Sequence, residues 1–236
     1  MVDYKACLAE FIGTFFLCFC GIAAILSNHS GSGVGLVGIA LAHGVAIAVA
    51  VSLFAGVSGG HFNPAVTGGM LATGRIKIPS AVAYIFSQCL ASVTAAFLCT
   101  TIFQDLNPDA ITEAKLGIPL PGADTDGGWL ISSGTVLLAE FIMTFLLVIA
   151  FFGTVVDSRG AVVNIGGLAI GLTMTIDILA GGHITGASMN PARSFGPALV
   201  HGFFELHHLY WIGPLTGGIV AALVYQHLIL GEQDVS

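Results

Sequence analysis

Two short stretches decide the fold of this chain: HFNPAVTGGMLAT at positions 61–73 and SMNPARSFGPALV at positions 188–200. Asn followed by Pro is a strong signal for a helix start, because the Asn side chain caps free backbone N–H groups and Pro has no N–H of its own to satisfy. About ten residues follow in each stretch, which corresponds to a helix of about 15 Å. That length is about half the hydrocarbon thickness of a bilayer, so neither helix can span a membrane alone.

The composition around these stretches is typical of a membrane protein. Of the 236 residues, 56% are hydrophobic and 8% are charged, whereas soluble domains carry about 25% charged residues. The mean hydropathy is +0.95. Apolar runs that are long enough to cross a bilayer as helices of about 20 residues occur at 6–26, 34–55, 80–103, 134–154, 162–180 and 209–230.

The chain also repeats itself. LAEFIGTFFL at 8–17 returns as LAEFIMTFLL at 138–147, and Asn-Pro-Ala at 63–65 returns at 190–192. Each repeat holds three spans, and because three is odd the second copy enters the membrane from the opposite side. Inverted repeats of this kind place their functional site near the bilayer midplane. The sequence therefore predicts a single all-α membrane domain over 1–236, with repeat 1 at about 1–103, a linker loop at about 104–133 and repeat 2 at about 134–236.

Two half-helices that enter from opposite sides would meet at their asparagines and together form a discontinuous seventh span. Each helix N-terminus carries about half a positive charge, so two such ends at the midplane form a barrier to cations and protons. The carboxamide oxygens of Asn63 and Asn190 would cap the helices and leave the NH₂ donors free for the lumen. Water that gives its lone pairs to both asparagines cannot continue a proton wire. This arrangement favours the passage of neutral molecules and excludes ions.

In this setting the motifs resemble those of the aquaporin (major intrinsic protein) family, with SGGHFN at 58–63 and SMNPARS at 188–194 as further family-like stretches, and the resemblance covers essentially the whole chain. The resemblance implies six transmembrane helices plus two re-entrant half-helices in an inverted 3+3 repeat. It also implies a passive channel for water, assembled as a homotetramer in the lipid bilayer with one pore per subunit. The pore motifs would be Asn63, Pro64, Ala65, Asn190, Pro191 and Ala192.

In this family a second constriction near the extracellular mouth is formed by four positions, which the resemblance places at His43, Ile178, Ala187 and Arg193. A lone arginine at such depth is costly and indicates a function. The set resembles the tonoplast-intrinsic type, whose members carry water and often ammonia. We therefore expect ammonia as a second substrate, with His43 donating a hydrogen bond to it or relaying a proton, and urea and hydrogen peroxide as further candidates. The alternative is that His43 only orients Arg193 or fills a packing position.

Three polar residues are assigned to pore lining or loop support. Glu10 and Glu140 occupy matching places in the repeats, and we expect them to accept hydrogen bonds from backbone N–H groups of the re-entrant loops. A proton relay is the usual alternative for buried acids in membranes, but it would contradict the barrier at the asparagines. For His61 the resemblance implies a place in the lumen lining.

Other features have packing or interfacial explanations. The glycine pairs 167/171 and 213/217 have the small-residue spacing that lets membrane helices approach closely. Helical geometry turns Asp177 away from the lumen, toward a neighbouring helix or subunit. We expect the histidines at 201, 207 and 208 to be solvated at the membrane interface, with a pH or metal gate as the alternative.

Other function classes fit the sequence less well. Glycerol or urea facilitators typically carry an Asp five residues after the filter arginine, where this chain has Ala198, and lack the Tyr210-Trp211 pair that opens the last span. A secondary active transporter also uses inverted repeats, but would need an ion- or substrate-binding cluster at the midplane. No serine–histidine, paired-aspartate or metal-ligand constellation indicates an enzyme. We therefore predict no catalytic residue, metal, cofactor or nucleic-acid partner.

The basic residues indicate the orientation of the chain. Six spans put both termini on one side, together with Lys5, Arg75, Lys77 and Arg159. By the positive-inside rule that side is cytoplasmic. The net charge of −7 comes largely from the linker and the tail and does not require a basic partner. A cell membrane (plasma or inner) is the expected location, and an organelle membrane is the alternative.

Overall fold

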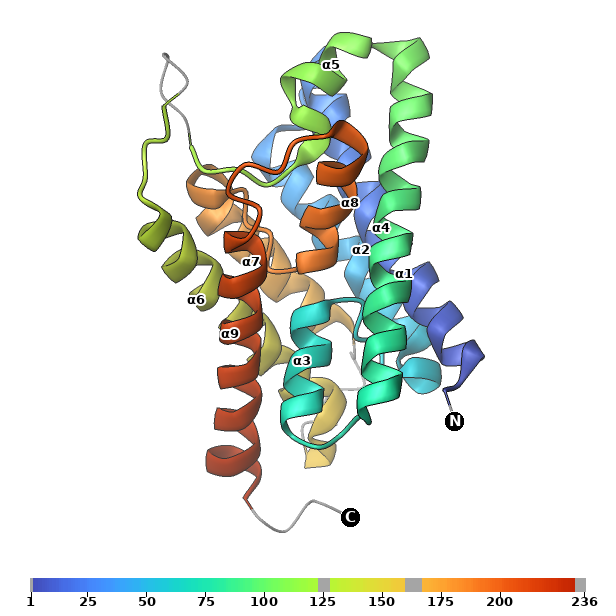
Figure 1. The fold of residues 1–236 in the computed structure, drawn as a ribbon, viewed down its shortest axis with the longest axis vertical. Coiled ribbons are helices and arrows are strands. Elements are labelled where there is room, and N and C mark those ends of the chain that lie inside the picture. The colour runs from blue at the N-terminus through green and yellow to red at the C-terminus, as the bar shows by residue number, and fades with distance from the viewer. Residues whose placement is uncertain (1, 123–127, 160–166, 232–236) are drawn as a thin grey trace.

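A computed structural model describes residues 2–122, 128–159 and 167–231, and Figure 1 shows that these residues form a bundle of helices. No strand is present among them. Six of the helices in these ranges are long and apolar enough to cross a membrane. In chain order these spans are built on α1 (Tyr4–Ser27), α2 (Gly35–Ser58), α4 (Ile78–Leu106), α6 (Ser133–Phe151), α7 (Gly167–Thr185) and α9 (Leu209–Val224).

Short π-helical turns continue three of these spans at their C-terminal ends. They are η1 (Asn28–Ser32) after α1, η3 (Phe152–Val156) after α6 and η5 (Tyr225–Leu230) after α9. The predicted apolar runs correspond to the six helices, with ends that differ by a few residues. The beginning of the fifth run, 162–166, lies outside the described residues. The predicted all-α fold with six spans is confirmed for the described residues.

Two shorter helices, α3 (Pro64–Ala72) and α8 (Pro191–His201), start at the Asn-Pro-Ala stretches. In Figure 1 they lie one below the other in the middle of the bundle, between α4 and α9. Each packs against a span of the other repeat, because α3 contacts α9 and α8 contacts α4. The two repeats are therefore interlocked. The start of α1 and the end of the last span both lie at the α3 end of the molecule (Figure 1).

The linker predicted as a loop over about 104–133 is partly helical, so this prediction is wrong in part. The span α4 continues to Leu106, and α5 (Pro108–Glu113) and the 3₁₀ turn η2 (Lys115–Gly117) follow. Asn107 and Pro108 repeat the helix-start signal, and Asn107 Oδ1 accepts a hydrogen bond from Ala110 N at 3.4 Å. Residues 123–127 of the linker lie outside the described part of the chain.

Glycines allow the central helices to touch backbone to backbone. A Cβ atom at Gly44 of α2 would overlap the carbonyl oxygen of Gly171 in α7, and a Cβ at Gly171 would overlap that of Gly44. Side chains at Gly167 and Gly217 would overlap the carbonyl oxygens of Ala48 and Phe141 in the same way. The close approach predicted from the glycine spacing is confirmed at these contacts, and it keeps the bundle narrow.

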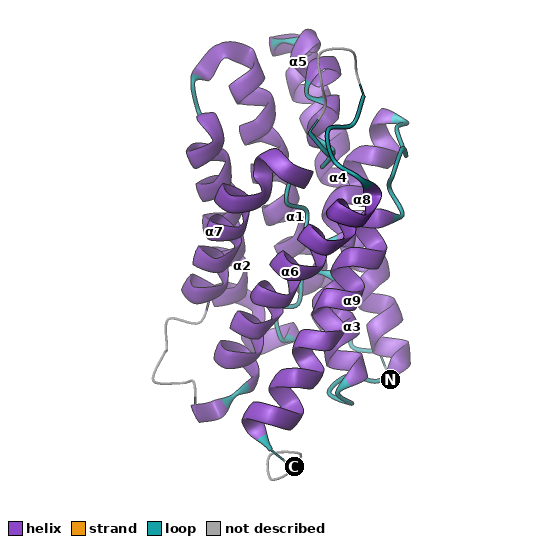
Figure 2. Cartoon of the chain, turned by 90° about the vertical axis from the view of Figure 1, so that its left-hand side faces the viewer, coloured by secondary structure: helices purple, strands orange, loops and turns teal. Residues whose placement is uncertain are grey.

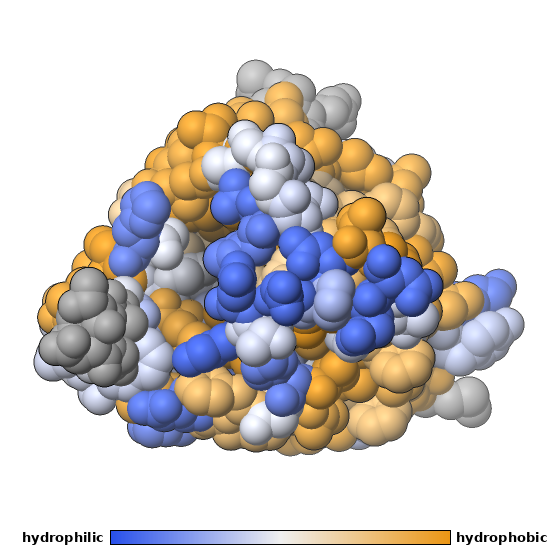
Figure 3. All heavy atoms as spheres, turned by 90° about the horizontal axis from the view of Figure 1, so that it is seen from above, coloured by the Kyte–Doolittle hydropathy of each residue, from blue (hydrophilic) through white to orange (hydrophobic). Residues whose placement is uncertain are grey.

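Apolar side chains cover the flanks of the bundle, as a surface in contact with lipid requires. Figure 2 shows the spans running along the long axis with the loops at the two ends. In Figure 3, which looks onto the α5 end, hydrophilic residues gather over the middle of the face and hydrophobic residues form its rim. Exposed members of α2 and α7 follow each other at helical spacing, among them Val37, Leu41, Val45, Leu168, Leu172 and Ile176.

Candidate functional site

The two half-helices are capped by the asparagines of their motifs. Asn63 Oδ1 accepts from Ala65 N at 2.8 Å, and Asn190 Oδ1 accepts from Ala192 N at 3.0 Å. Pro64 and Pro191 stand in the first turns, where a missing N–H costs nothing. Both helix N-termini are thereby fixed, and their partial positive charges are directed at the place where the helices meet.

Each asparagine also bonds to the loop of the other repeat. Asn63 Nδ2 donates to the carbonyl oxygen of Met189 at 2.8 Å, and Asn190 Nδ2 donates to that of Phe62 at 2.9 Å. We expected both N–H groups of each carboxamide to be free for the lumen. This is wrong for one N–H group of each asparagine. Each NH₂ has two hydrogens, so one N–H ties the repeats together and one remains.

The two accepting carbonyls belong to residues in the left-handed backbone region. Phe62 has φ 49° and Met189 has φ 54°, which costs a non-glycine residue about 1–2 kcal/mol. Surrounding contacts must hold such a conformation. The strain is stored at matching places in the two repeats, next to the asparagines, where it directs the carbonyl groups across the interface.

Glu10 and Glu140 supply those contacts. Glu10 accepts hydrogen bonds from the backbone N–H groups of His61 at 2.9 Å and Phe62 at 2.6 Å. Glu140 accepts from Ser188 N at 2.9 Å and from Met189 N at 2.8 Å. Both carboxylates are fully buried. These are hydrogen bonds of the kind expected from the sequence. They hold Phe62 and Met189 through their backbone N–H groups, while the asparagines bind the carbonyl oxygens of the same residues.

Hydroxyl groups complete the support of each loop. Ser58 Oγ donates to Glu10 and Thr185 Oγ1 donates to Glu140, both at 2.6 Å. Tyr84 and Tyr210 donate to the carbonyl oxygens of Ser58 at 2.9 Å and Thr185 at 2.8 Å. From sequence, Tyr210 is considered only as part of the pair that opens the last span, and Tyr84 is assigned no role. Their matching places in the two repeats are the signal that could have identified this role.

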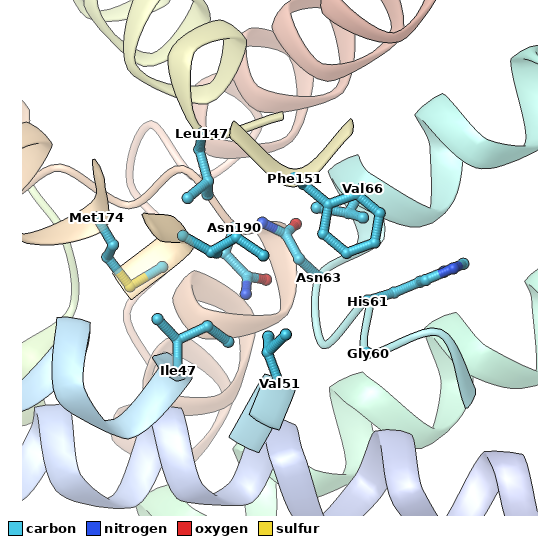
Figure 4. A pocket seen from close by; sticks show the side chains of 11 residues that line it. Ile47, Val51, Gly60, His61, Asn63, Val66, Leu147, Phe151, Met174 and Asn190 are labelled. Atoms are coloured by element: carbon cyan, nitrogen blue, oxygen red, sulfur yellow. The ribbon is translucent and has the colours of Figure 1, made fainter. Parts of the chain in front are cut away.

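A narrow cavity lies where the half-helices meet, and Figure 4 shows its lining. The carboxamides of Asn63 and Asn190 lie side by side in the middle of this view, among apolar side chains. The cavity leaves about 10 Å³ of free space, which is about the space of one water molecule. The apolar part of the lining consists of Ile47, Val51, Val66, Leu147, Phe151, Ile170 and Met174.

His61 also borders this cavity. Its Nδ1 lies 3.1 Å from Thr67 Oγ1, and the Thr67 hydroxyl donates its hydrogen to the carbonyl oxygen of Asn63 at 3.0 Å. Because that hydroxyl has one hydrogen, Nδ1 of His61 must be the donor to Thr67 and Nε2 carries the lone pair of the neutral ring. Phe151 packs against this ring at an interplanar angle of 86°, with centroids 5.8 Å apart.

Toward the α5 end, His43 of α2 has the same tautomer. Its Nδ1 lies 2.9 Å from the carbonyl oxygen of Ile39. A carbonyl can only accept, so Nδ1 carries the hydrogen and the Nε2 of the neutral ring can only accept. The expectation that uncharged His43 donates a hydrogen bond to a solute is therefore wrong. A solute can instead donate a hydrogen bond to the lone pair of Nε2.

Arg193 stands in the first turn of α8, close enough to His43 to interact with it electrostatically. It is 7% exposed, and within the described part of the chain its guanidinium makes no hydrogen bond, with Nη1 buried and unpartnered. Ile178 and Ala187, which are also buried, lie in one apolar cluster with Met143. Unpaired guanidinium donors in a membrane protein require acceptors from water or a solute.

Asp177 and the histidines near α9 lie outside these two constrictions. Asp177 is 2% exposed, and its carboxylate acts electrostatically with Glu140 of the adjacent α6, so a neighbouring helix is its environment. His207 is half-buried beside the rings of Phe195 and Phe204 and accepts a hydrogen bond from Trp211 Nε1 at 3.0 Å. Burial lowers the pKa of His207. His207 is therefore only partly solvated, whereas its neighbour His208 is exposed.

Comparison with known proteins now gives the family. The family model described as Major intrinsic protein matches residues 1–225. The chain belongs to the major intrinsic protein family. Aquaporin TIP4-4 of Zea mays is 42% identical over 97% of this chain and 88% of its own length. Aquaporin TIP2-1 of Arabidopsis thaliana is 39% identical over 99% of this chain and 91% of its own length.

The fold has a counterpart among solved structures. The aquaglyceroporin from Plasmodium falciparum superposes with a TM-score of 0.79 and covers 96% of both chains, at 22% sequence identity. As a member of the major intrinsic protein family, this chain is a multi-pass membrane channel and not an enzyme. Family membership implies water as the transported substrate.

Proposed function

We propose that this channel conducts water and ammonia and excludes protons and other ions. The observation that carries the proposal is the pair of crossed asparagines at the meeting point of two helix N-termini. Each carboxamide keeps one N–H for the lumen, so a water molecule at this point receives hydrogen bonds and cannot pass a proton onward. The positive ends of α3 and α8 disfavour a cation at the same place.

Ammonia is selected at the proposed outer constriction of His43, Ile178, Ala187 and Arg193. Ammonia has one lone pair and three hydrogens, so it can accept from Arg193 and donate to Nε2 of His43 at the same time. Ammonium has no lone pair and therefore cannot accept from Arg193, whose positive charge also repels it. Glycerol is much larger than ammonia, and the narrow space beside the asparagines argues against solutes of its size.

The test uses proteoliposomes loaded with a pH-sensitive dye. A sucrose jump measures water flux from vesicle shrinkage, and an ammonium chloride jump measures ammonia entry from internal alkalinisation. The intact channel is expected to speed both. In His43→Phe the acceptor is lost, and because one hydrogen bond contributes about 1 kcal/mol, ammonia permeability should fall about fivefold. Water flux should stay within about twofold in this variant.

His208→Phe is the matched control, since His208 is exposed and lies outside the proposed constriction. Both fluxes should be unchanged in this variant. If the intact channel carries water but no ammonia, the ammonia part of the proposal is wrong. If it carries neither, the whole proposal is wrong, provided that the reconstituted protein elutes as a single folded species.

The assembly and orientation belong to the same proposal. The family resemblance suggests a homotetramer, and the exposed apolar rows on α2 and α7 are surfaces that neighbouring subunits or lipid would cover. Native mass spectrometry from detergent would test this, and a monomer mass would contradict it. Labelling of single cysteines placed beside Lys5 and Arg75, in intact cells, would test the cytoplasmic location proposed for that end.

A further inference from the structure

Gly21 in α1 faces the ring of His43 in α2. A Cβ atom added at Gly21 would overlap the ring atoms Nε2, Cδ2 and Cε1 of His43. Gly21 is buried, and His43 is 3% exposed. The ring therefore occupies a niche in the surface of α1 that exists because residue 21 has no side chain.

The backbone gives no separate reason for glycine at this place. Gly21 lies inside α1, and its φ angle is not positive. Glycine in the interior of a helix is less favourable than alanine, because it loses more conformational freedom on folding. The reason for glycine is therefore packing against the histidine ring.

The ring is fixed at one end and open at the other. Nδ1 donates to the carbonyl oxygen of Ile39 at 2.9 Å, which prevents the ring from turning freely. Nε2 has no hydrogen-bond partner in the described part of the chain, and it is not one of the fully buried polar atoms that lack a partner. The same nitrogen thus lies over Gly21 and keeps a small exposed surface, as an atom at the edge of a narrow lumen would.

We propose that Gly21 is a specificity-determining residue of the outer constriction, because it lets the ring of His43 sit back into α1. This inference rests on the proposed function, since it takes His43 as part of the pore wall. A side chain at residue 21 would drive the ring away from α1 and toward Arg193. The width of the constriction then depends on a fifth position, on a helix that contributes none of the four proposed filter residues.

The position that matches Gly21 in the second repeat is Phe151, at the same offset of 130 that relates Glu10 to Glu140. Phe151 packs edge to face against His61, which borders the cavity beside the asparagines, with ring centroids 5.8 Å apart. One repeat therefore offers a niche to a histidine, and the other offers a large ring to a histidine. A small residue at 21 is thus not imposed by the repeated fold.

The test is a double-mutant cycle in proteoliposomes, with ammonia and water permeability measured for the intact channel, Gly21→Ala, His43→Ala and the double variant. In Gly21→Ala the ratio of ammonia to water permeability should fall about tenfold, because overpacking of this size is relieved by moving the ring into the lumen. In the His43→Ala background the added methyl group meets no ring, so Gly21→Ala should change that ratio less than about twofold.

Gly56→Ala is the matched control, because a Cβ at Gly56 of α2 has no neighbour within 4 Å, and its permeability ratio should equal that of the intact channel. If Gly21→Ala does not fold, the double variant and His43→Ala still carry the test, because removal of the ring leaves room for the methyl group. Two results would overturn the inference: an unchanged ratio in Gly21→Ala, or a ratio that falls equally with and without the ring. If the intact channel itself transports neither solute, the proposed function has failed, which is a separate result.

Discussion

The two repeats hold the centre of the pore with the same contacts, yet they face its two ends with different side chains. Around the centre, Glu10 and Glu140 bond the loops, and Asn63 and Asn190 exchange hydrogen bonds across the interface. Away from the centre the match ends. Two residues after Pro64 stands Val66, whereas the same place after Pro191 is occupied by Arg193.

The spans also differ at one matching pair of positions, where Gly21 faces His43 and Phe151 faces His61. Residues that must repeat are those that satisfy buried backbone groups, since both loops have the same polar atoms to satisfy inside a membrane. Residues that contact the lumen are free to differ. An inverted repeat can therefore build a symmetric barrier at its centre and a selective constriction at only one end.

Removal of either loop-holding acid should have the largest effect. Glu10→Ala leaves four donors without an acceptor, from Ser58, His61, Phe62 and Gln88. Each unsatisfied buried donor costs about 1–3 kcal/mol, so we expect loss of the folded channel, measured by size-exclusion chromatography after heating.

Glu140→Ala should behave alike, because Thr185, Ser188 and Met189 lose the same acceptor. The glutamine variants keep one acceptor oxygen and should retain part of the stability. If one alanine variant kept the thermal stability of the intact channel while the other unfolded, the two repeats would not be equivalent.

Arg193→Val gives the second repeat the side chain that the first repeat has, and tests the difference between the two ends. The proposed constriction would lose its positive charge, so proton or cation leak should rise about tenfold or more while water flux stays within about twofold. The leak is measured with the pH dye under a potassium diffusion potential. Arg193→Lys keeps the charge and should remain tight, and a tight Arg193→Val channel would assign ion exclusion to the centre alone.

Tyr84→Phe and Tyr210→Phe should have the smallest effects and make the sharpest test of symmetry. Each removes one hydroxyl that donates to a loop carbonyl, which corresponds to about 1 kcal/mol. Because the two bonds are nearly equal in length and burial, the two variants should lose similar amounts of thermal stability and keep their water flux. A loss confined to one variant would show that only one loop depends on its tyrosine.

Much of the fold could be predicted from local patterns. The six spans follow from runs of apolar residues, and both half-helices follow from Asn-Pro at positions 63–64 and 190–191, because hydropathy and capping act over neighbouring residues. In the linker, the same local signal was present but was not used in the prediction. Asn107-Pro108 is a further copy of the same start signal and begins α5, although the surrounding proline- and glycine-rich sequence was interpreted as a loop.

By itself, the sequence determined the membrane setting, the inverted repeat, the capping of α3 and α8 and the matching places of Glu10 and Glu140. Only the tertiary structure decided that each asparagine gives one N–H to the opposite loop, because donor and acceptor are 126 and 128 residues apart. It also decided the tautomer of His43 and the niche at Gly21. Such contacts depend on which helix faces meet, and that is settled by packing of the whole bundle rather than by any local pattern.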